Sequence, residues 1–168
     1  GAAELMAEAN GIRRAAHVRE KLVKLIAYAE TVRALTKAAA WECKMLDGRV
    51  AVPDPVITNM AKWYFANNFH QHVAYLQDIA GGLLVTGPDE ADLKNPETAG
   101  YITKYLGGKK GIPTEDRLKL FNLIRDLTAS DIGGYNEILS IHAEGSLEAQ
   151  KLTIAMEYDT KPSVEYVK

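Results

Sequence analysis

The stretch AAHVREKLVKLIAYAETVRAL, residues 15–35, decides the fold class of this chain. It lies in a segment rich in Ala, Leu, Glu, Lys and Arg, which are all good helix formers. Apolar side chains recur there at the three- and four-residue spacing of one helix face. They are Leu22, Leu25, Ile26, Ala29, Val32, Leu35 and Ala39. We therefore expect a long helix over residues 2–46, whose one weak point is Asn10-Gly11.

Turn and capping residues divide the rest of the chain into further helices. Asp54 is a good N-cap with Pro55 at the first helical position, and Gly81-Gly82 can end the helix that follows. Shorter helices are expected over 96–106, 114–127 and 147–158, the last capped by Ser146. Residues 83–94 are expected to be irregular, and 48–52 and 163–167 to be short extended pieces.

These elements predict an all-α fold in a single domain over residues 1–168. It would be an antiparallel helical bundle of four main helices plus one or two short ones. Because the chain starts at Gly1 inside a helical pattern, we expect it to be a piece of a longer protein.

Composition narrows the class of protein. With 20 basic and 22 acidic residues the net charge is −2, which argues against binding to nucleic acid. The sequence contains no apolar run of about 18 residues, so we expect no membrane span. No signal peptide is visible either. Cys43 is the one cysteine, so we expect neither a disulfide framework nor a multi-cysteine metal site. A single thiol is compatible with the cytoplasm, and we expect a cytoplasmic location.

The segment DIGGYNEILSIHAEGS, residues 131–146, concentrates polar groups and glycines. Two glycines directly before a short helix would expose backbone N–H groups to an electron-rich ligand. Tyr135 and Asn136 could hydrogen-bond to a flat cofactor or stack on it. Glu137 and His142 are five residues apart, so they would not lie directly above one another on a helix. The alternative is a plain helix–helix connection, and the spacing matches no Walker or Rossmann fingerprint.

A second glycine-bearing segment is QDIAGG, residues 77–82. Its glycines indicate either close approach by a ligand or another subunit, or only a helix C-cap. Nearby, His70 and His72 do not share a helix face, so they indicate either a wet pocket or a solvated surface.

A basic cluster lies in the expected long helix. It consists of Arg13, Arg14, His17 and Arg19. It could meet phosphate or form a surface charge run.

Three stretches together resemble the C-terminal helical region of the 4-hydroxyphenylacetate 3-monooxygenase family, which includes a 4-hydroxybutyryl-CoA dehydratase/vinylacetyl-CoA isomerase branch. They are AAHVREKLVKLIAYAETVRAL, DIAGGLLVTGPDEADLKNPE and DIGGYNEILSIHAEGSLEAQ. The resemblance covers essentially the whole chain in order and implies a bundle like the C-terminal domain of acyl-CoA dehydrogenases.

The resemblance implies FAD as cofactor and assembly into a homo-oligomer, a dimer or tetramer. It places cofactor contacts at Ile132, Gly133, Gly134, Tyr135 and Asn136. It places further contacts at Gln77, Gly81 and Gly82, near the cofactor or a subunit interface.

The resemblance also implies the chemistry. Glu137 and His142 become candidate catalytic residues, although the Tyr135–His142 spacing is one residue longer than in the family pattern. The substrate would be an acyl-CoA or a phenol. The dehydratase branch carries a [4Fe–4S] cluster whose ligands precede the region matched here; Cys43 matches none of them, and one cysteine could not hold it.

Two functions follow as hypotheses. The chain would supply one wall of a flavin site and oligomer contacts in a dehydratase/isomerase or a monooxygenase. Alternatively, it would be a non-catalytic bundle that only self-associates.

Overall fold

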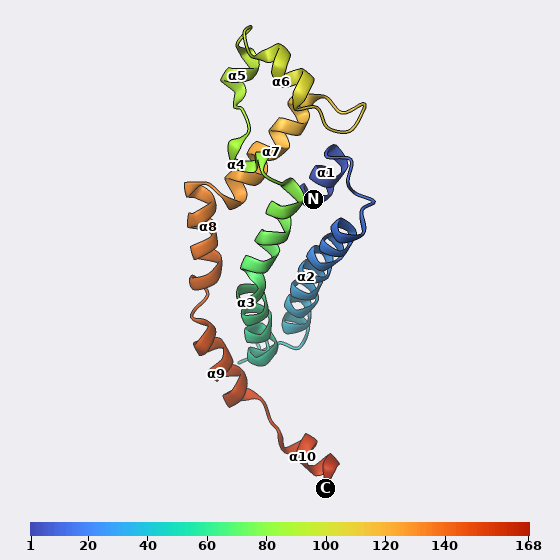
Figure 1. Ribbon diagram of the computed structural model, residues 1–168. Helices are drawn as coiled ribbons and strands as arrows, with labels where there is room; N and C mark the ends of the chain where they lie inside the picture. Colours follow the sequence, from blue (N-terminus) through green and yellow to red (C-terminus); the bar gives the residue numbers. More distant parts are fainter. The chain divides into compact units, whose positions relative to one another are not determined.

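The computed structural model describes residues 1–168, and its elements are almost all helices (Figure 1). The helices are α1 (Ala2–Ala9), α2 (Ala16–Trp41), α3 (Pro55–Ala80), α4 (Leu83–Thr86), α5 (Glu90–Lys94), α6 (Ala99–Tyr105), α7 (Thr114–Thr128), α8 (Asp131–His142), α9 (Leu147–Glu157) and α10 (Lys161–Val167). One hairpin joins α2 to α3, with β1 (Lys44–Leu46) antiparallel to β2 (Val50–Val52) and Lys44 opposite Val52. The predicted all-α class is confirmed.

Contacts divide the chain into two compact units. The first comprises Gly1–Ile26 and His70–Ile138, and the second comprises Ala27–Phe69 and Leu139–Lys168. The single-domain expectation stays a prediction.

The core of the first unit gathers around α7. Leu118, Phe121 and Ile124, spaced by three along α7, are almost completely buried. They share a cluster with Met6 of α1, Ile79 of α3 and other apolar side chains. The remaining buried members are Ala3, Ala7, Ala9, Val18, Leu22, Ala80, Leu84 and Ile102.

The predicted helix over residues 2–46 is wrong in two respects, because it breaks completely after Ala9 and ends at Trp41, before the strand Lys44–Leu46. Gly11 takes a left-handed conformation with φ 72°, which glycine adopts without steric cost. The Asn10 amide donates to the carbonyl of Ile79 at 3.1 Å and accepts from Arg117 Nε at 2.8 Å. Tertiary hydrogen bonds at Asn10 therefore replace the continuation of the helix.

The second unit is built on the aromatic side chains of α2 and α3. The Tyr28 ring stacks on Phe65 at 5.9 Å between centroids, and its hydroxyl donates to the Phe65 carbonyl at 2.7 Å. Burial raises the pKa of Tyr28 above its usual range, so the hydroxyl stays protonated and can donate. Asp54 caps α3 as predicted, because its carboxylate accepts from the Ile57 N–H at 2.8 Å.

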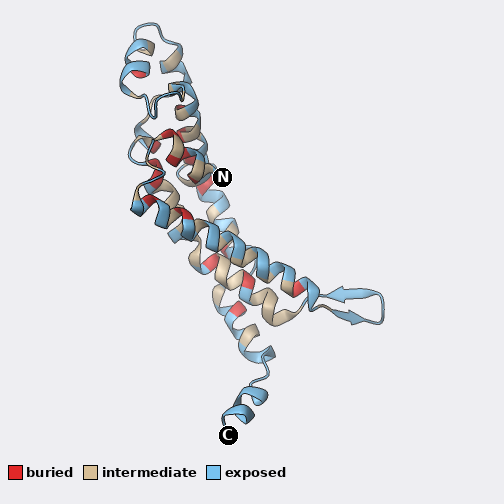
Figure 2. Cartoon of the chain, turned by 90° about the vertical axis from the view of Figure 1, so that its right-hand side faces the viewer, coloured by how far each residue is buried: buried red, intermediate tan, exposed pale blue.

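The β1–β2 hairpin has no core of its own. All six strand residues are exposed, as the pale blue colour of the hairpin shows in Figure 2. The predicted extended piece at 48–52 is confirmed at Val50–Val52.

Two predicted irregular or extended segments are helical instead. Residues 83–94 contain α4 and α5, and Asp89 and Asp92 form a reciprocal capping box at the start of α5. Residues 163–167 belong to α10, where Pro162 occupies the first turn and Asp159 accepts from the Lys161 N–H at 3.0 Å. A capping box at residues 89–92 and a first-turn proline at residue 162 therefore favour helices in these two places.

Candidate functional site

Helix α8 carries most of the candidate site residues, and it begins earlier than the sequence indicated. Ser130 caps it, because its hydroxyl accepts from the Gly133 N–H at 3.1 Å and its carbonyl from the Gly134 N–H at 2.9 Å. The two glycines therefore lie inside the helix, not before it. The expected free N–H groups at Gly133 and Gly134 are thus a wrong prediction, and a ligand must use the side of the helix.

The two glycines have different surroundings. A Cβ on Gly133 would lie 3.0–3.1 Å from backbone atoms of Asp126, Leu127 and Thr128, at the end of α7. A Cβ on Gly134 would meet nothing within 4 Å. Close packing against the end of α7 explains why position 133 is a glycine. No such contact exists at Gly134, which leaves open space beside α8.

Alanine at these two positions is expected to have opposite effects on stability. Gly133→Ala should lower the free energy of unfolding by about 1–3 kcal/mol, because backbone atoms must move to admit the methyl group. Gly134→Ala should raise it by about 0.5–1 kcal/mol, because alanine favours a helix more than glycine does. Equilibrium urea unfolding of both variants measures the difference, and equal changes would contradict this account of the α7–α8 turn.

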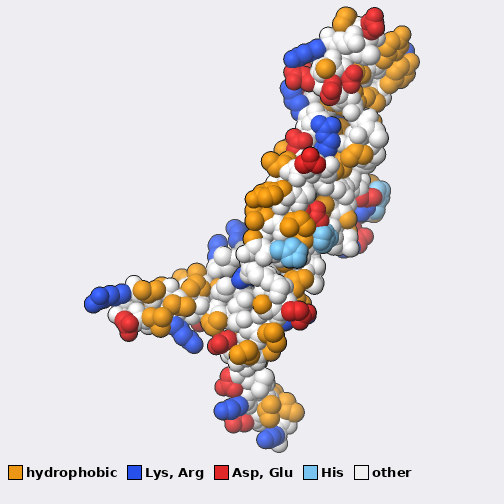
Figure 3. Space-filling model, turned by 90° about the vertical axis from the view of Figure 1, so that its left-hand side faces the viewer, with side chains coloured by type: hydrophobic (Ala, Val, Ile, Leu, Met, Phe, Trp, Pro, Cys, Tyr) orange, Lys and Arg blue, Asp and Glu red, His pale blue; other side chains and the backbone are white.

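Apolar side chains next to Gly134 face outward. At about 100° per residue, an arc of about 220° round α8 contains, in this order, Glu137, Gly134, Ile138, Tyr135 and Ile132. Ile132, Tyr135 and Ile138 expose 61%, 67% and 61% of their surfaces. Figure 3 shows hydrophobic side chains gathered on the face of the molecule that includes α8. Exposed apolar residues in such a group indicate a surface that another molecule covers.

The edge of this surface carries a charged pair. The Glu137 carboxylate contacts Nδ1 of His70, which projects from α3. The Glu137 side chain is 25% exposed and that of His70 is 68% exposed, so the carboxylate is the better-shielded partner. A half-buried carboxylate held by an imidazole, beside the open space at Gly134, can accept or deliver a proton.

Sequence reasoning missed His70 as the partner of Glu137. The two residues are 67 positions apart, and no local pattern relates their helices. His142 ends α8, about 140° round the helix from Glu137, and is exposed.

The second candidate segment meets the first at Thr128. The Gln77 side-chain amide donates to the Thr128 carbonyl at 3.0 Å, and Gly133 packs on the backbone of the same residue. Gln77 is therefore held beside the start of α8, as a shared site with residues 132–136 requires.

Gly81 and Gly82 end α3. The Gly81 N–H donates to the Gln77 carbonyl at 2.8 Å, and Gly81 adopts φ 82°. The helix C-cap, one of the two sequence alternatives, is therefore present. A Cβ on Gly81 or Gly82 would meet nothing within 4 Å, so both glycines are also accessible from outside.

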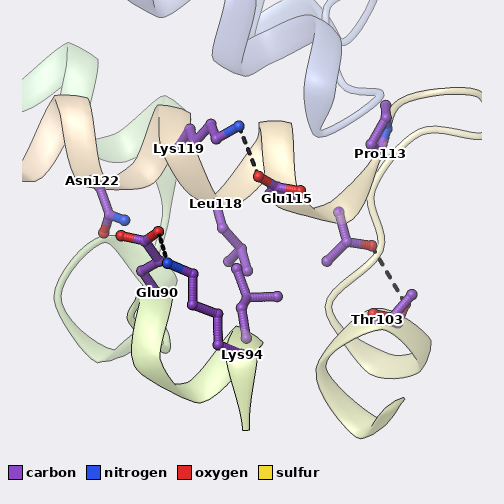
Figure 4. A pocket seen from close by; sticks show the side chains of 10 residues that line it. Glu90, Lys94, Thr103, Pro113, Glu115, Leu118, Lys119 and Asn122 are labelled. Carbon is purple, nitrogen blue, oxygen red and sulfur yellow. Dashed lines mark hydrogen bonds and ion pairs between the residues drawn. The ribbon is translucent and has the colours of Figure 1, made fainter. Parts of the chain in front are cut away.

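A separate cavity of 610 Å³ lies between α5, α6 and the start of α7 (Figure 4). Glu90 pairs with Lys94, and Glu115 pairs with Lys119, over a floor that includes Leu118. The ion pair with Lys119 holds the pKa of the Glu115 carboxyl below its usual range. The lining of this cavity carries two acidic and two basic side chains that pair with one another, so neither sign of charge is in excess for a charged ligand.

Neither a metal site nor a membrane-spanning helix is found in the structure. No three His, Cys, Asp or Glu side chains come together in a way that could hold a metal ion. None of the helices combines the length and the apolar character needed to cross a membrane.

Comparison with known proteins identifies the family. The family described as "HpaB: 4-hydroxyphenylacetate 3-hydroxylase C terminal" matches residues 1–168. The chain belongs to the HpaB C-terminal family. The resemblance found in the glycine-bearing segments is thereby confirmed.

Members of both HpaB branches are similar to this chain. The 4-hydroxybutyryl-CoA dehydratase/vinylacetyl-CoA-Delta-isomerase of Clostridium aminobutyricum is 30% identical over the whole chain, which covers 36% of that protein. An oxygen-tolerant archaeal 4-hydroxybutyryl-CoA dehydratase from N. maritimus has a TM-score of 0.89 at 29% identity, over 98% of this chain and 33% of that one. The oxygenase component of a 4-hydroxyphenylacetate 3-monooxygenase, in complex with FAD, has a TM-score of 0.91 at 29% identity. That match covers 99% of this chain and 35% of the oxygenase chain. The chain thus spans about a third of the length of these HpaB relatives.

Proposed function

We propose that this chain is the flavin-contacting and oligomer-forming helical part of an FAD-dependent enzyme of the dehydratase/isomerase type, acting on a four-carbon acyl-CoA. The observation that carries the proposal is the exposed arc of α8, which ends at the Glu137–His70 pair. A flavin is supported by the related oxygenase component, which is known in complex with FAD. Hydroxylation of a phenol is the second candidate, supported by the equally similar monooxygenase.

The side chains on α8 fit one face of a flat, largely apolar ring system. Ile132, Tyr135 and Ile138 would contact the ring, and the missing side chain at Gly134 would let it approach the helix closely. Asn136, also exposed, would supply a hydrogen bond at the rim. When bound, the flavin supplies the electron chemistry that no side chain here can provide.

The residues at the Gln77 end would complete this wall. Gln77 is fixed beside the start of α8 through Thr128, and the accessible backbone of Gly81 and Gly82 follows it. These glycines would meet the cofactor or a neighbouring subunit.

Glu137 would move a proton at a substrate carbon. Its contact with His70 orients the carboxylate. His142 is the second candidate for proton transfer, at the far end of the same helix.

Self-association would cover the remaining exposed apolar side chains. Leu152 and Met156 of α9 expose 61% and 81% of their surfaces, and Tyr166 of α10 exposes 92%. Such residues favour a dimer or tetramer of the complete enzyme.

Removal of the Tyr135 ring is expected to weaken flavin binding. Tyr135→Ala should raise the Kd for FAD about five- to tenfold, because an aromatic stacking contact is lost. Quenching of FAD fluorescence during titration measures this change. Tyr105→Ala, which removes an exposed tyrosine of α6, is the matched control and should leave the Kd unchanged.

The titration separates the proposal from the alternative of a plain self-associating bundle. An unchanged affinity for FAD in Tyr135→Ala would show that α8 does not contact the flavin. A folded chain that binds no FAD, alone or with the rest of its enzyme, would leave only the bundle. Assays of the complete enzyme with 4-hydroxybutyryl-CoA, and with 4-hydroxyphenylacetate plus reduced flavin, decide between the two reactions.

A further inference from the structure

A basic pocket lies in the first unit, away from α8. It has a volume of 590 Å³ and is lined by Glu8, Gly11, Arg13, Arg14 and Lys109. Three of these residues are cations and one is an anion, although the chain as a whole has a net charge of −2. The fold thus concentrates positive charge in one hollow.

Segments far apart in the sequence build this pocket. Arg13 and Arg14 occupy the turn between α1 and α2, whereas Lys109 belongs to the GGKKG loop before α7, residues 107–111. The Lys109 N–H donates to the Ala9 carbonyl at 2.9 Å, which fixes the loop against the end of α1. The sequence pattern indicated the two arginines, but it could not predict that Lys109 lies beside them.

Polar and packing contacts hold the walls of the pocket in place. Arg117 supports the loop by donating to the Leu106 carbonyl at 2.7 Å and to Asn10 at 2.8 Å. Gly108 packs so closely on Ala9 that no side chain fits between them. The backbone around the pocket is therefore fixed before any ligand binds.

The three cationic side chains differ in their ion-pair partners. Arg13 pairs with Glu4 and Lys109 pairs with Glu8, but all four side chains are about half exposed. Exposed pairs of this kind contribute little to stability, so a stronger anion can replace the carboxylates. Arg14 is exposed and forms no ion pair. Arginine guanidinium groups bind phosphate with two parallel hydrogen bonds.

We propose that this pocket binds the phosphate or pyrophosphate group of a nucleotide through Arg14, Arg13 and Lys109. A cavity of this size, with three cationic side chains around it, suits a polyanion better than a single carboxylate. The dinucleotide end of FAD and the phosphorylated end of coenzyme A share this chemistry. Naming FAD or coenzyme A as the source of the phosphate rests on the proposed function. The assignment of a phosphate site to this pocket does not depend on it.

The first test measures the binding of inorganic pyrophosphate by titration calorimetry at low salt. The wild-type protein is expected to bind it, with an affinity that falls as salt screens the charges. Arg14→Gln should weaken binding about tenfold, because one charge-assisted hydrogen-bonding group is lost. Arg49→Gln, an equal change of charge in the exposed hairpin turn, should leave the affinity unchanged.

The second test identifies the source of the phosphate. Tighter binding of 3′-phospho-ADP than of ADP assigns the site to coenzyme A, because FAD lacks the 3′-phosphate, whereas equal or weaker binding assigns it to the dinucleotide. No binding of pyrophosphate by the folded protein, or equal losses in Arg14→Gln and Arg49→Gln, overturns the proposal.

These outcomes are separate from those of the flavin wall. Pyrophosphate binding that needs Arg14 supports the pocket even if FAD does not bind. FAD binding that needs Tyr135 but not Arg14, with no binding of pyrophosphate, removes the pocket and leaves the proposed function standing.

Discussion

Glutamine in place of Glu137 is expected to lower kcat of the FAD-loaded enzyme by about 10²- to 10⁴-fold, the usual contribution of a general acid or base. Glutamine has the shape of glutamate but cannot take up a proton from the substrate. KM should change much less, because the shape of the site is kept. Steady-state kinetics with the preferred substrate measure both constants.

Companion variants make this result specific. Glu137→Asp should retain more activity than Glu137→Gln, because it keeps a carboxylate. His70→Gln should cost less than Glu137→Gln, since His70 only positions the carboxylate. Unchanged kcat in Glu137→Gln would exclude the role, and a larger loss in His142→Gln would transfer it to His142.

Alanine in place of Gly108 is expected to lower the free energy of unfolding by about 3 kcal/mol or more. The new Cβ would lie 2.2 Å from the Ala9 carbonyl oxygen and 2.6 Å from Cδ of Arg117. Arg117 can move, but the backbone of Ala9 is fixed by its hydrogen bond to Lys109. Urea unfolding followed by circular dichroism measures the loss.

Gly107→Ala is the matched control for Gly108→Ala. A Cβ at Gly107 meets its nearest neighbours at 3.8 Å, which is an ordinary contact distance. The two variants share the change in backbone entropy, so the difference between them isolates the close approach. Equal stabilities would show that the loop can leave α1 without cost.

Local signals predicted the helices wherever a capping residue acts on its own segment. Asp54 starts α3 and Ser146 starts α9, and each accepts a hydrogen bond from the third residue after it. The break after Ala9 could not be predicted in full, because Asn10 bonds with Ile79 and Arg117, which are far away in sequence.

The candidate site was predictable as a segment but not as an arrangement. The composition of residues 131–146 drew attention to α8, and the family resemblance named its residues. The side of the helix that each residue occupies depends on where α8 begins, and the Ser130 cap shifted that start ahead of the glycines. The contact of Glu137 with His70, and the presence of Arg14 and Lys109 at one pocket, depend on how distant segments of the chain meet, which no spacing along the chain reveals.

The hairpin between α2 and α3 has a different consequence, which concerns the energetics of local opening. Its ladder joins three residue pairs, all exposed, and no apolar side chain of the strands is buried. An isolated two-stranded hairpin is only marginally stable in water. Its hydrogen bonds can therefore open and close while the helices stay intact, and its amide protons should exchange with solvent far faster than those of α7.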